Sequence, residues 1–358
     1  MSTSSAEHDT YLVENWDTET LILHLKEQNL KLDDDDLGIL RKKKINGLSF
    51  LEMTEEKFMQ DGLERGPAIL LAKEVQTLKE KPKRAFSTYR SLKEVLTKYG
   101  IDSNGTDTIP IFSLQTHEIQ DSNKHFEHCM AEILVRLKNY GSLVFDSLEA
   151  MRNEYVVAIF HTAINITRDA TGKEFSMRPE YEIVGDESSG RVDFAIKVIV
   201  YFFFRDQTSF FENILIHYFS FQEAEDLVCV AEDKPERNVI EGFAQNIKQL
   251  ESSFQTNKRK GKRDDDDFDY LYGVVTTARD WHFLLYTPGV ISQGSKLPLS
   301  IEFSEDALKK DSVEYQTLHN GVKKVLGVVV GLLKDRACAE DDSPSKKKAR
   351  IEEYRSKK

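Results

Sequence analysis

The sequence predicts a two-domain protein: a small all-α five-helix bundle followed by an α/β domain with a mixed central sheet flanked by helices. Three observations predict this. The chain has 358 residues, 40% of them hydrophobic, which is enough for one small and one medium core. Apolar residues recur at helical spacing over residues 18–81. Beyond residue 180 they instead alternate or form continuous runs, as buried strands do.

The first region carries start signals for short helices. Leu21 and Leu25 are four residues apart and share a helical face. Thr54 precedes two acidic residues, which is typical of an N-cap followed by an acidic first turn. Pro67 opens the last predicted helix, where its missing N–H costs little.

Several of these segments together resemble a sterile alpha motif (SAM) domain, which we expect over residues 9–81. The segments are Trp16, Ile45–Gly47, Thr54–Phe58 and the turn Gly62–Pro67. The resemblance implies a helical bundle that binds other proteins or copies of itself. It also implies an acidic and a basic docking face, unless both are merely solvated surface. The acidic face would be Asp33, Asp34, Asp35 and Asp36, and the basic face Arg65 and Lys73.

In the remaining chain, the residue pattern predicts a linker over residues 82–121, with one short helix near 91–99. It predicts an α/β domain over residues 122–337. Strands are expected at 181–184, 192–201, 227–231, 270–275 and 282–286. Helices are expected at 150–166, 239–250 and 313–333. Residues 338–358 are predicted to form a disordered basic tail.

Acidic and basic residues gather on two of the predicted strands. Glu232 and Lys234 are two positions apart, so they point to the same face of their strand. If the strand carrying Asp193 lies alongside, two carboxylates and an ammonium converge. Mg²⁺ is commonly held by one or two carboxylates, so Asp193, Glu232 and the carbonyl of Asp233 are its predicted ligands. Lys234 would then stabilise charge that develops on a phosphate.

Glu154, on the preceding helix, is expected to add a carboxylate at the metal edge. This order of helix, strand, strand and a helix bearing Gln245 and Gln249 resembles the PD-(D/E)XK restriction-endonuclease-like family, over about residues 151–286. The resemblance implies Mg²⁺-dependent DNA cleavage by Asp193, Glu232 and Lys234, with Gln245 supporting the site. The region is also similar to nuclease-like modules beside interaction domains in filamentous and mycorrhizal fungi, including relatives of Crinkler effectors.

One segment departs from this pattern. Asp193 and Glu232 are separated by 39 positions, which is long for a hairpin. Much of the gap, residues 198–221, holds seven of the chain's 21 phenylalanines and indicates an inserted segment that separates the two strands. The alternative hypothesis is therefore a non-catalytic adaptor, in which the nuclease-like domain only binds nucleic acid or protein.

Charge and targeting signals predict that the protein is located in the nucleus, or else in the cytoplasm. The net charge of −12 argues against nucleic-acid binding by electrostatics alone. The tail is basic, and Lys346, Lys347, Lys348 and Arg350 resemble a nuclear-import signal. No secretory signal is expected, and the most apolar run, residues 198–204, is far shorter than the roughly 20 residues that span a membrane.

Overall fold

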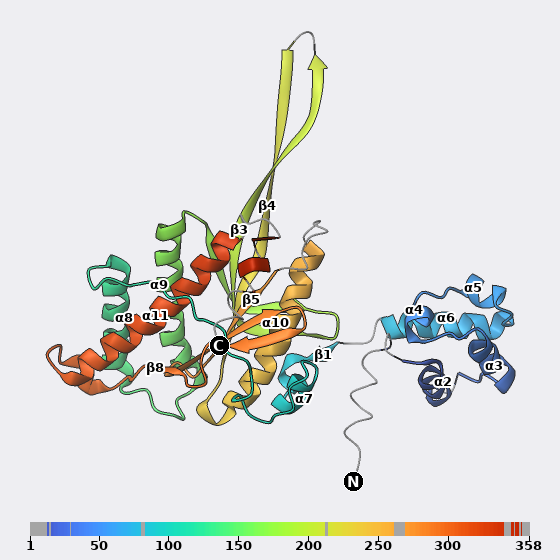
Figure 1. Ribbon diagram of the computed structural model, residues 1–358, viewed down its shortest axis with the longest axis horizontal. Helices are drawn as coiled ribbons and strands as arrows, with labels where there is room; N and C mark the ends of the chain where they lie inside the picture. Colours follow the sequence, from blue (N-terminus) through green and yellow to red (C-terminus); the bar gives the residue numbers. More distant parts are fainter. Residues whose placement is uncertain are drawn as a thin grey trace. The chain divides into compact units, whose positions relative to one another are not determined.

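The computed structural model describes residues 13, 16–28, 30–79, 83–211, 214–260, 269–339, 345–346, 348–350 and 352 (Figure 1). The chain divides into two compact units, Met1–Arg84 and Ala85–Lys358. The first is helical and the second is α/β, as the sequence predicts. In the described residues, no helix is both long and apolar enough to cross a membrane.

The described part of the first unit contains five helices. They are α2 (Thr18–Glu27), α3 (Asp34–Lys42), α4 (Gly47–Leu51), α5 (Glu55–Gln60) and α6 (Arg65–Lys79). The side chains of Asp17, Asp33, Asn46 and Thr54 cap four of these helices by accepting backbone N–H groups. The apolar faces bury a shared core that includes Trp16. The helical period and the caps are local signals, which is why the sequence predicted these helices.

The second unit has a mixed sheet between two helical layers. Its strands are β2 (Phe175–Val184), β3 (Ser188–Phe211), β4 (Ile214–Asp233), β5 (Leu271–Thr276), β6 (Asp280–Thr287), β7 (Val290–Gln293) and β8 (Leu299–Ser300); β1 is the pair Arg84–Ala85. Its α-helices are α7 (Leu92–Thr97), α8 (Lys124–Tyr140), α9 (Glu149–Thr171), α10 (Val239–Lys260) and α11 (Val313–Ala339). The sheet runs β3–β4–β5–β6–β7, with β2 beside β3 and β8 beside β6.

Helix α10 connects the two parallel strands of this sheet. β2, β3 and β4 pair antiparallel, whereas β4 and β5 pair parallel and α10 connects them. Helices α8, α9 and α11 cover one face, and α7 and α10 cover the other. Successive strand residues alternate between these two cores, as Phe194 and Ala195 do. Because both faces are buried, the strands read as continuous apolar runs.

The phenylalanine-rich segment extends a hairpin and does not separate its strands. β3 and β4 pair from Phe194↔Ala231 to Phe211↔Ile214, with register shifts at Ile196/Lys197 and Asp206/Ser209. Together they form the long two-stranded arm in Figure 1. The arm grows from the end of the hairpin opposite to Asp193. The expectation that residues 198–221 displace one strand from the other is therefore wrong.

Two other expectations differ from the structure. The predicted linker, 82–121, belongs to the second unit from Ala85 onward, and Phe86, Leu92 and Leu96 pack in the same core as α10. Short helices that bury a single face give a weak periodic signal, so a packed segment resembled a linker. In the predicted disordered tail, α11 continues to Ala339 and residues 348–350 are helical, with Arg350 Nη1 lying 2.6 Å from Asp335 Oδ1.

Candidate functional site

Asp193 and Glu232 face each other across β3 and β4. The register Phe194↔Ala231, continued by one residue, places Asp193 opposite Glu232. Both side chains have the strand parity of Ala195 and Val230, which contact the α10 layer, and Lys234 follows with the same parity. The structure therefore brings the three predicted residues to one face at the end of the hairpin.

Hydrogen bonds hold both carboxylates in place. Lys234 Nζ lies 2.7 Å from Glu232 Oε1, and the other oxygen of Glu232 accepts a 2.5 Å hydrogen bond from Gln249 Nε2. Asp193 Oδ2 accepts a 2.6 Å hydrogen bond from the backbone N–H of Asp233. Among the described residues, the second oxygen of Asp193 has no hydrogen-bond partner. One carboxylate oxygen is thus available to a ligand.

Burial and mutual repulsion make this pair electrostatically unfavourable. Burial, and then the negative charge of Glu232, raise the pKa of Asp193 to about 8. Burial also raises the pKa of Glu232, although Lys234 and Gln249 oppose the shift. Burial lowers the pKa of Lys234, but the carboxylates of Glu232, Asp193 and Glu149 together outweigh burial and raise it. The single ammonium of Lys234 is therefore too little positive charge to balance two ionised carboxylates. Carboxylates whose pKa is strongly shifted in this way are typical of functional sites.

Asp233 points to the opposite face of the sheet and is held by Arg152. Arg152 Nη2 and Nε lie 2.8 Å and 3.0 Å from Asp233 Oδ2, and both side chains are buried. Arg152 Nη1 also donates to the carbonyl of Ser147 at 2.6 Å. Burial raises the pKa of Asp233 to about 6, because the ion pair offsets only part of that effect. The Asp233 carboxylate is thus engaged by Arg152, which leaves the carbonyl as the group it offers to a metal.

Glu154 does not join the cluster. It is exposed on α9, and its Oε2 accepts a 3.2 Å hydrogen bond from Arg136 Nε on α8. The charge of Glu149, in the first turn of α9, instead contributes to the raised pKa values of Glu232, Asp233 and Lys234. Five positions along a helix amount to about 500°, so Glu154 lies about 140° around the axis from Glu149. The α9 carboxylate whose charge reaches the cluster is therefore Glu149, and not the predicted Glu154.

Gln249, and not Gln245, supports Glu232. Both residues are buried on α10, one turn apart, but only Gln249 hydrogen-bonds Glu232. Asn246 Nδ2 donates to Gln249 Oε1 at 3.2 Å, which directs the amide N–H of Gln249 toward the carboxylate. Helix α10 approaches closely because Gly242 has no side chain: a Cβ there would lie 3.0 Å from the Cγ of Lys234.

The donor set suits a hard divalent cation with few protein ligands. Asp193 and Glu232 supply buried carboxylate oxygens whose repulsion a cation would relieve, and Mg²⁺ is commonly bound by one or two carboxylates plus substrate phosphate. Within the described residues, no group of three or more His, Cys, Asp and Glu side chains is arranged to hold a metal. The two carboxylates are thus fewer side-chain ligands than an all-protein metal cage contains.

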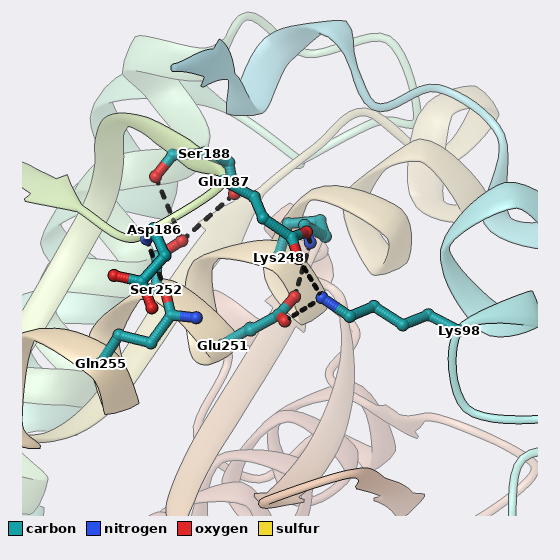
Figure 2. A network of polar contacts seen from close by, with 8 residues as sticks. All are labelled: Lys98, Asp186, Glu187, Ser188, Lys248, Glu251, Ser252 and Gln255. Atoms are coloured by element: carbon teal, nitrogen blue, oxygen red, sulfur yellow. Dashed lines mark hydrogen bonds and ion pairs between the residues drawn. The ribbon is translucent and has the colours of Figure 1, made fainter. Parts of the chain in front are cut away.

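A second polar cluster, on the α7 side of α10, has the opposite character (Figure 2). Lys248 Nζ lies 2.5 Å from Glu251 Oε2 and 2.8 Å from Glu187 Oε2, and Lys98 also pairs with both glutamates. Burial opposes the shift, but the two glutamates raise the pKa of Lys248 to about 12, and the lysines lower that of Glu187. Every charge here is compensated, so this cluster ties α7, the β2–β3 turn and α10 together.

Asp193 should make the stability of the second unit depend on pH. An unfolded aspartate titrates near its ordinary pKa of 3.8, whereas folded Asp193 titrates near 8. Between these values the folded state binds more protons than the unfolded state, so the free energy of unfolding falls as pH rises. We expect Asp193→Asn to remove this part of the pH dependence of the free energy of unfolding. Urea unfolding at pH 5 and pH 8 in EDTA, followed by Trp281 fluorescence in a Trp16→Phe background, measures it. An unchanged pH dependence in the variant would contradict the raised pKa.

The predicted docking faces of the first unit are partly used by its own helices. Asp33 and Asp36 form a reciprocal capping box at the start of α3, whereas Asp34 and Asp35 are exposed. Arg65 lies 3.7 Å from Glu55, and Lys73 is exposed on α6. In the predicted import signal, Lys346, Lys348 and Arg350 lie in short helical segments, and Lys347 lies outside the described residues.

Comparison with known proteins bears on the first unit. Residues 1–77 match the sequence model of a SAM-like domain, which agrees with the helical bundle and with the resemblance seen in the sequence. A search among curated proteins finds no match to the chain. Residues 1–77 are therefore a SAM-like region, and an α/β domain with a mixed multi-strand sheet follows it.

Proposed function

We propose that the second unit is a Mg²⁺-dependent phosphodiesterase that cleaves nucleic acid, and that the SAM-like region recruits or assembles it. The convergence of Asp193, Glu232 and Lys234 at the end of the β3–β4 hairpin carries this proposal. The order α9, β3, β4 and α10 also matches the order of elements in the restriction-endonuclease-like resemblance. DNA is the substrate that this resemblance favours.

Each residue has a distinct task in this proposal. When bound, Mg²⁺ supplies Lewis-acid stabilisation of the phosphate and acidifies a water molecule. Asp193 and Glu232 hold the cation, and the N–H of Asp233 fixes the orientation of Asp193. Lys234 presents an ammonium where negative charge develops on the phosphate. The Gln249 amide keeps Glu232 from rotating away from Asp193.

The test is cleavage of supercoiled plasmid and of circular single-stranded DNA by the full chain in Mg²⁺ and in EDTA. We expect cleavage in Mg²⁺ alone. Gln249→Ala is expected to lower the rate about 10- to 100-fold, the usual cost of removing a group that orients a metal ligand. Gln245→Ala is the matched control and should stay near the wild-type rate. Absence of cleavage by the wild-type chain would favour the non-catalytic adaptor.

We further propose that the exposed acidic residues of α3 mediate self-association of the SAM-like region. Asp35→Lys should convert a concentration-dependent oligomer of the full chain into a monomer, because it reverses charge on the proposed face without touching the Asp33–Asp36 capping box. Sedimentation velocity measures this change. Glu52→Lys makes the same charge change at the end of α4, where the side chain is exposed, and should leave the assembly intact. A wild-type chain that sediments as a monomer at all concentrations would contradict the proposal.

A further inference from the structure

A surface cavity of about 750 Å³ adjoins the candidate site. Its walls are residues 145–149 before and at the start of α9, Arg152, and residues 235–237, which directly follow Lys234. Arg152 is the residue that holds Asp233, and Glu149 is the helix carboxylate whose charge reaches the cluster. The cavity thus lies at the end of β4 that carries the candidate site, and it is joined to that site through Arg152 and through the residues that follow Lys234.

An exposed aromatic side chain stands at this cavity. Phe145 is 62% exposed and Leu148 is 78% exposed, although both are large and apolar. The guanidinium carbon of Arg279 lies 4.3 Å from the centroid of the Phe145 ring. The ring is therefore supported on one face by a cation. Exposed aromatic rings of this kind provide stacking surfaces for single-stranded nucleic acid, because every base has a π face.

The charges of the cavity decide which part of a nucleotide suits it. Asp146, Glu149 and Glu236 contribute three carboxylates to the cavity. Among the described lining residues the cations are Arg152, which is paired with Asp233, and Arg237. A phosphate would be repelled there. A neutral base would not be repelled, and carboxylates accept hydrogen bonds from base amino groups, as they do from the N4 amino group of cytosine.

We propose that this cavity receives one unpaired base of a single-stranded nucleic acid, stacked on Phe145, while the adjoining phosphate lies at Lys234. This rests on the proposed function and narrows its substrate class from nucleic acid to single strands or unpaired ends. A base inside a duplex is paired and stacked on both sides, so entry would require its extrusion at a cost of a few kcal/mol.

Binding of short oligonucleotides by the full chain tests the inference without cleavage. Labelled oligo(dC), oligo(dT) and oligo(rC) of about 12 nucleotides, and a DNA duplex of equal length, would be titrated in EDTA at low ionic strength and followed by fluorescence anisotropy. We expect Phe145→Ala to weaken binding of oligo(dC) and oligo(rC) about 5- to 150-fold, since stacking of one base is worth about 1–3 kcal/mol. Phe145→Trp should retain the wild-type affinity.

The control is Tyr140→Ala, which removes an exposed aromatic ring at the end of α8, outside the cavity lining, and should leave affinity unchanged. Equal binding by the wild type and Phe145→Ala, tighter binding of the duplex, or tighter binding of oligo(dT) than of oligo(dC) would each overturn the inference. The ratio of oligo(rC) to oligo(dC) affinity identifies the preferred sugar.

Failure of this inference is distinguishable from failure of the proposed function. Phe145-dependent binding in EDTA without cleavage in Mg²⁺ would remove the catalytic role and keep the base cavity. Cleavage of duplex DNA by Phe145→Ala at the wild-type rate would remove the base cavity and keep the catalytic role.

Discussion

Asp193→Asn is expected to lower the rate of Mg²⁺-dependent cleavage by about 10³-fold or more while the protein stays folded. Asparagine keeps the shape of the side chain and one oxygen but loses the negative charge, and a bound metal contributes several kcal/mol of transition-state stabilisation at about 1.4 kcal/mol per tenfold in rate. Folding should survive, because burial and the charge of Glu232 raise the pKa of Asp193 well above its ordinary value, so a neutral side chain at this position does not cost the folded state a favourable charge. Single-turnover cleavage and urea unfolding measure the two effects separately.

Asp186→Asn provides the matched control for this prediction. Asp186 is exposed in the turn between β2 and β3, seven positions before Asp193, and its backbone N–H rather than its carboxylate bonds Gln255. Its substitution should leave the cleavage rate unchanged. If Asp193→Asn cleaved as fast as the wild type, the acidic pair would not be the catalytic site. If it failed to fold at neutral pH, the charge of Asp193 would be structural.

Arg152→Met is expected to destabilise the second unit by about 3–5 kcal/mol, the usual cost of removing one partner from a buried ion pair. The Arg152 side chain is 4% exposed and that of Asp233 is 0% exposed, so the remaining carboxylate would be left without compensation or solvent. The carbonyl of Ser147 would also lose its donor. Urea unfolding followed by Trp281 fluorescence, in the Trp16→Phe background, measures the loss.

Arg136→Met controls for the loss of an arginine on a helix of the same unit. Arg136 lies on α8 and pairs with Glu154, whose side chain is 48% exposed, so water can take the place of the lost partner. The expected loss is below about 1 kcal/mol. Similar losses in the two variants would mean that the Arg152–Asp233 pair does not behave as a buried pair.

Local periodicity accounts for the parts of the structure that the sequence predicted. The caps at Asp33 and Thr54 and the apolar helical spacing depend on neighbouring residues only, so the first unit was predicted well. The same holds for residues 192–198 of β3, residues 227–231 of β4 and strands β5 and β6, whose buried apolar runs stand out from their surroundings. Strands β7 and β8 were missed because four and two residues carry too little pattern.

Which side chains meet in the candidate site was only partly a local question. The sequence by itself determined that Glu232 and Lys234 share a face, because strand side chains alternate with a period of two. Only the tertiary structure decided that Glu149 and Gln249, and not Glu154 and Gln245, approach them. The rotation of α9 and α10 about their axes is set by packing against the sheet, and a shift of one turn or less exchanges one candidate for another.

Contacts between distant segments were likewise decided by the tertiary structure. Arg152 and Asp233 are 81 positions apart, and Arg279 reaches Phe145 from the turn before β6; neither pair leaves a signal in a single sequence. Residue types and local spacing thus determined the longer elements and the shared face of Glu232 and Lys234. Packing across the sheet decided which residues buttress that cluster and which cavity opens beside it, because those contacts depend on helix rotation and strand register rather than on neighbouring residues in the chain.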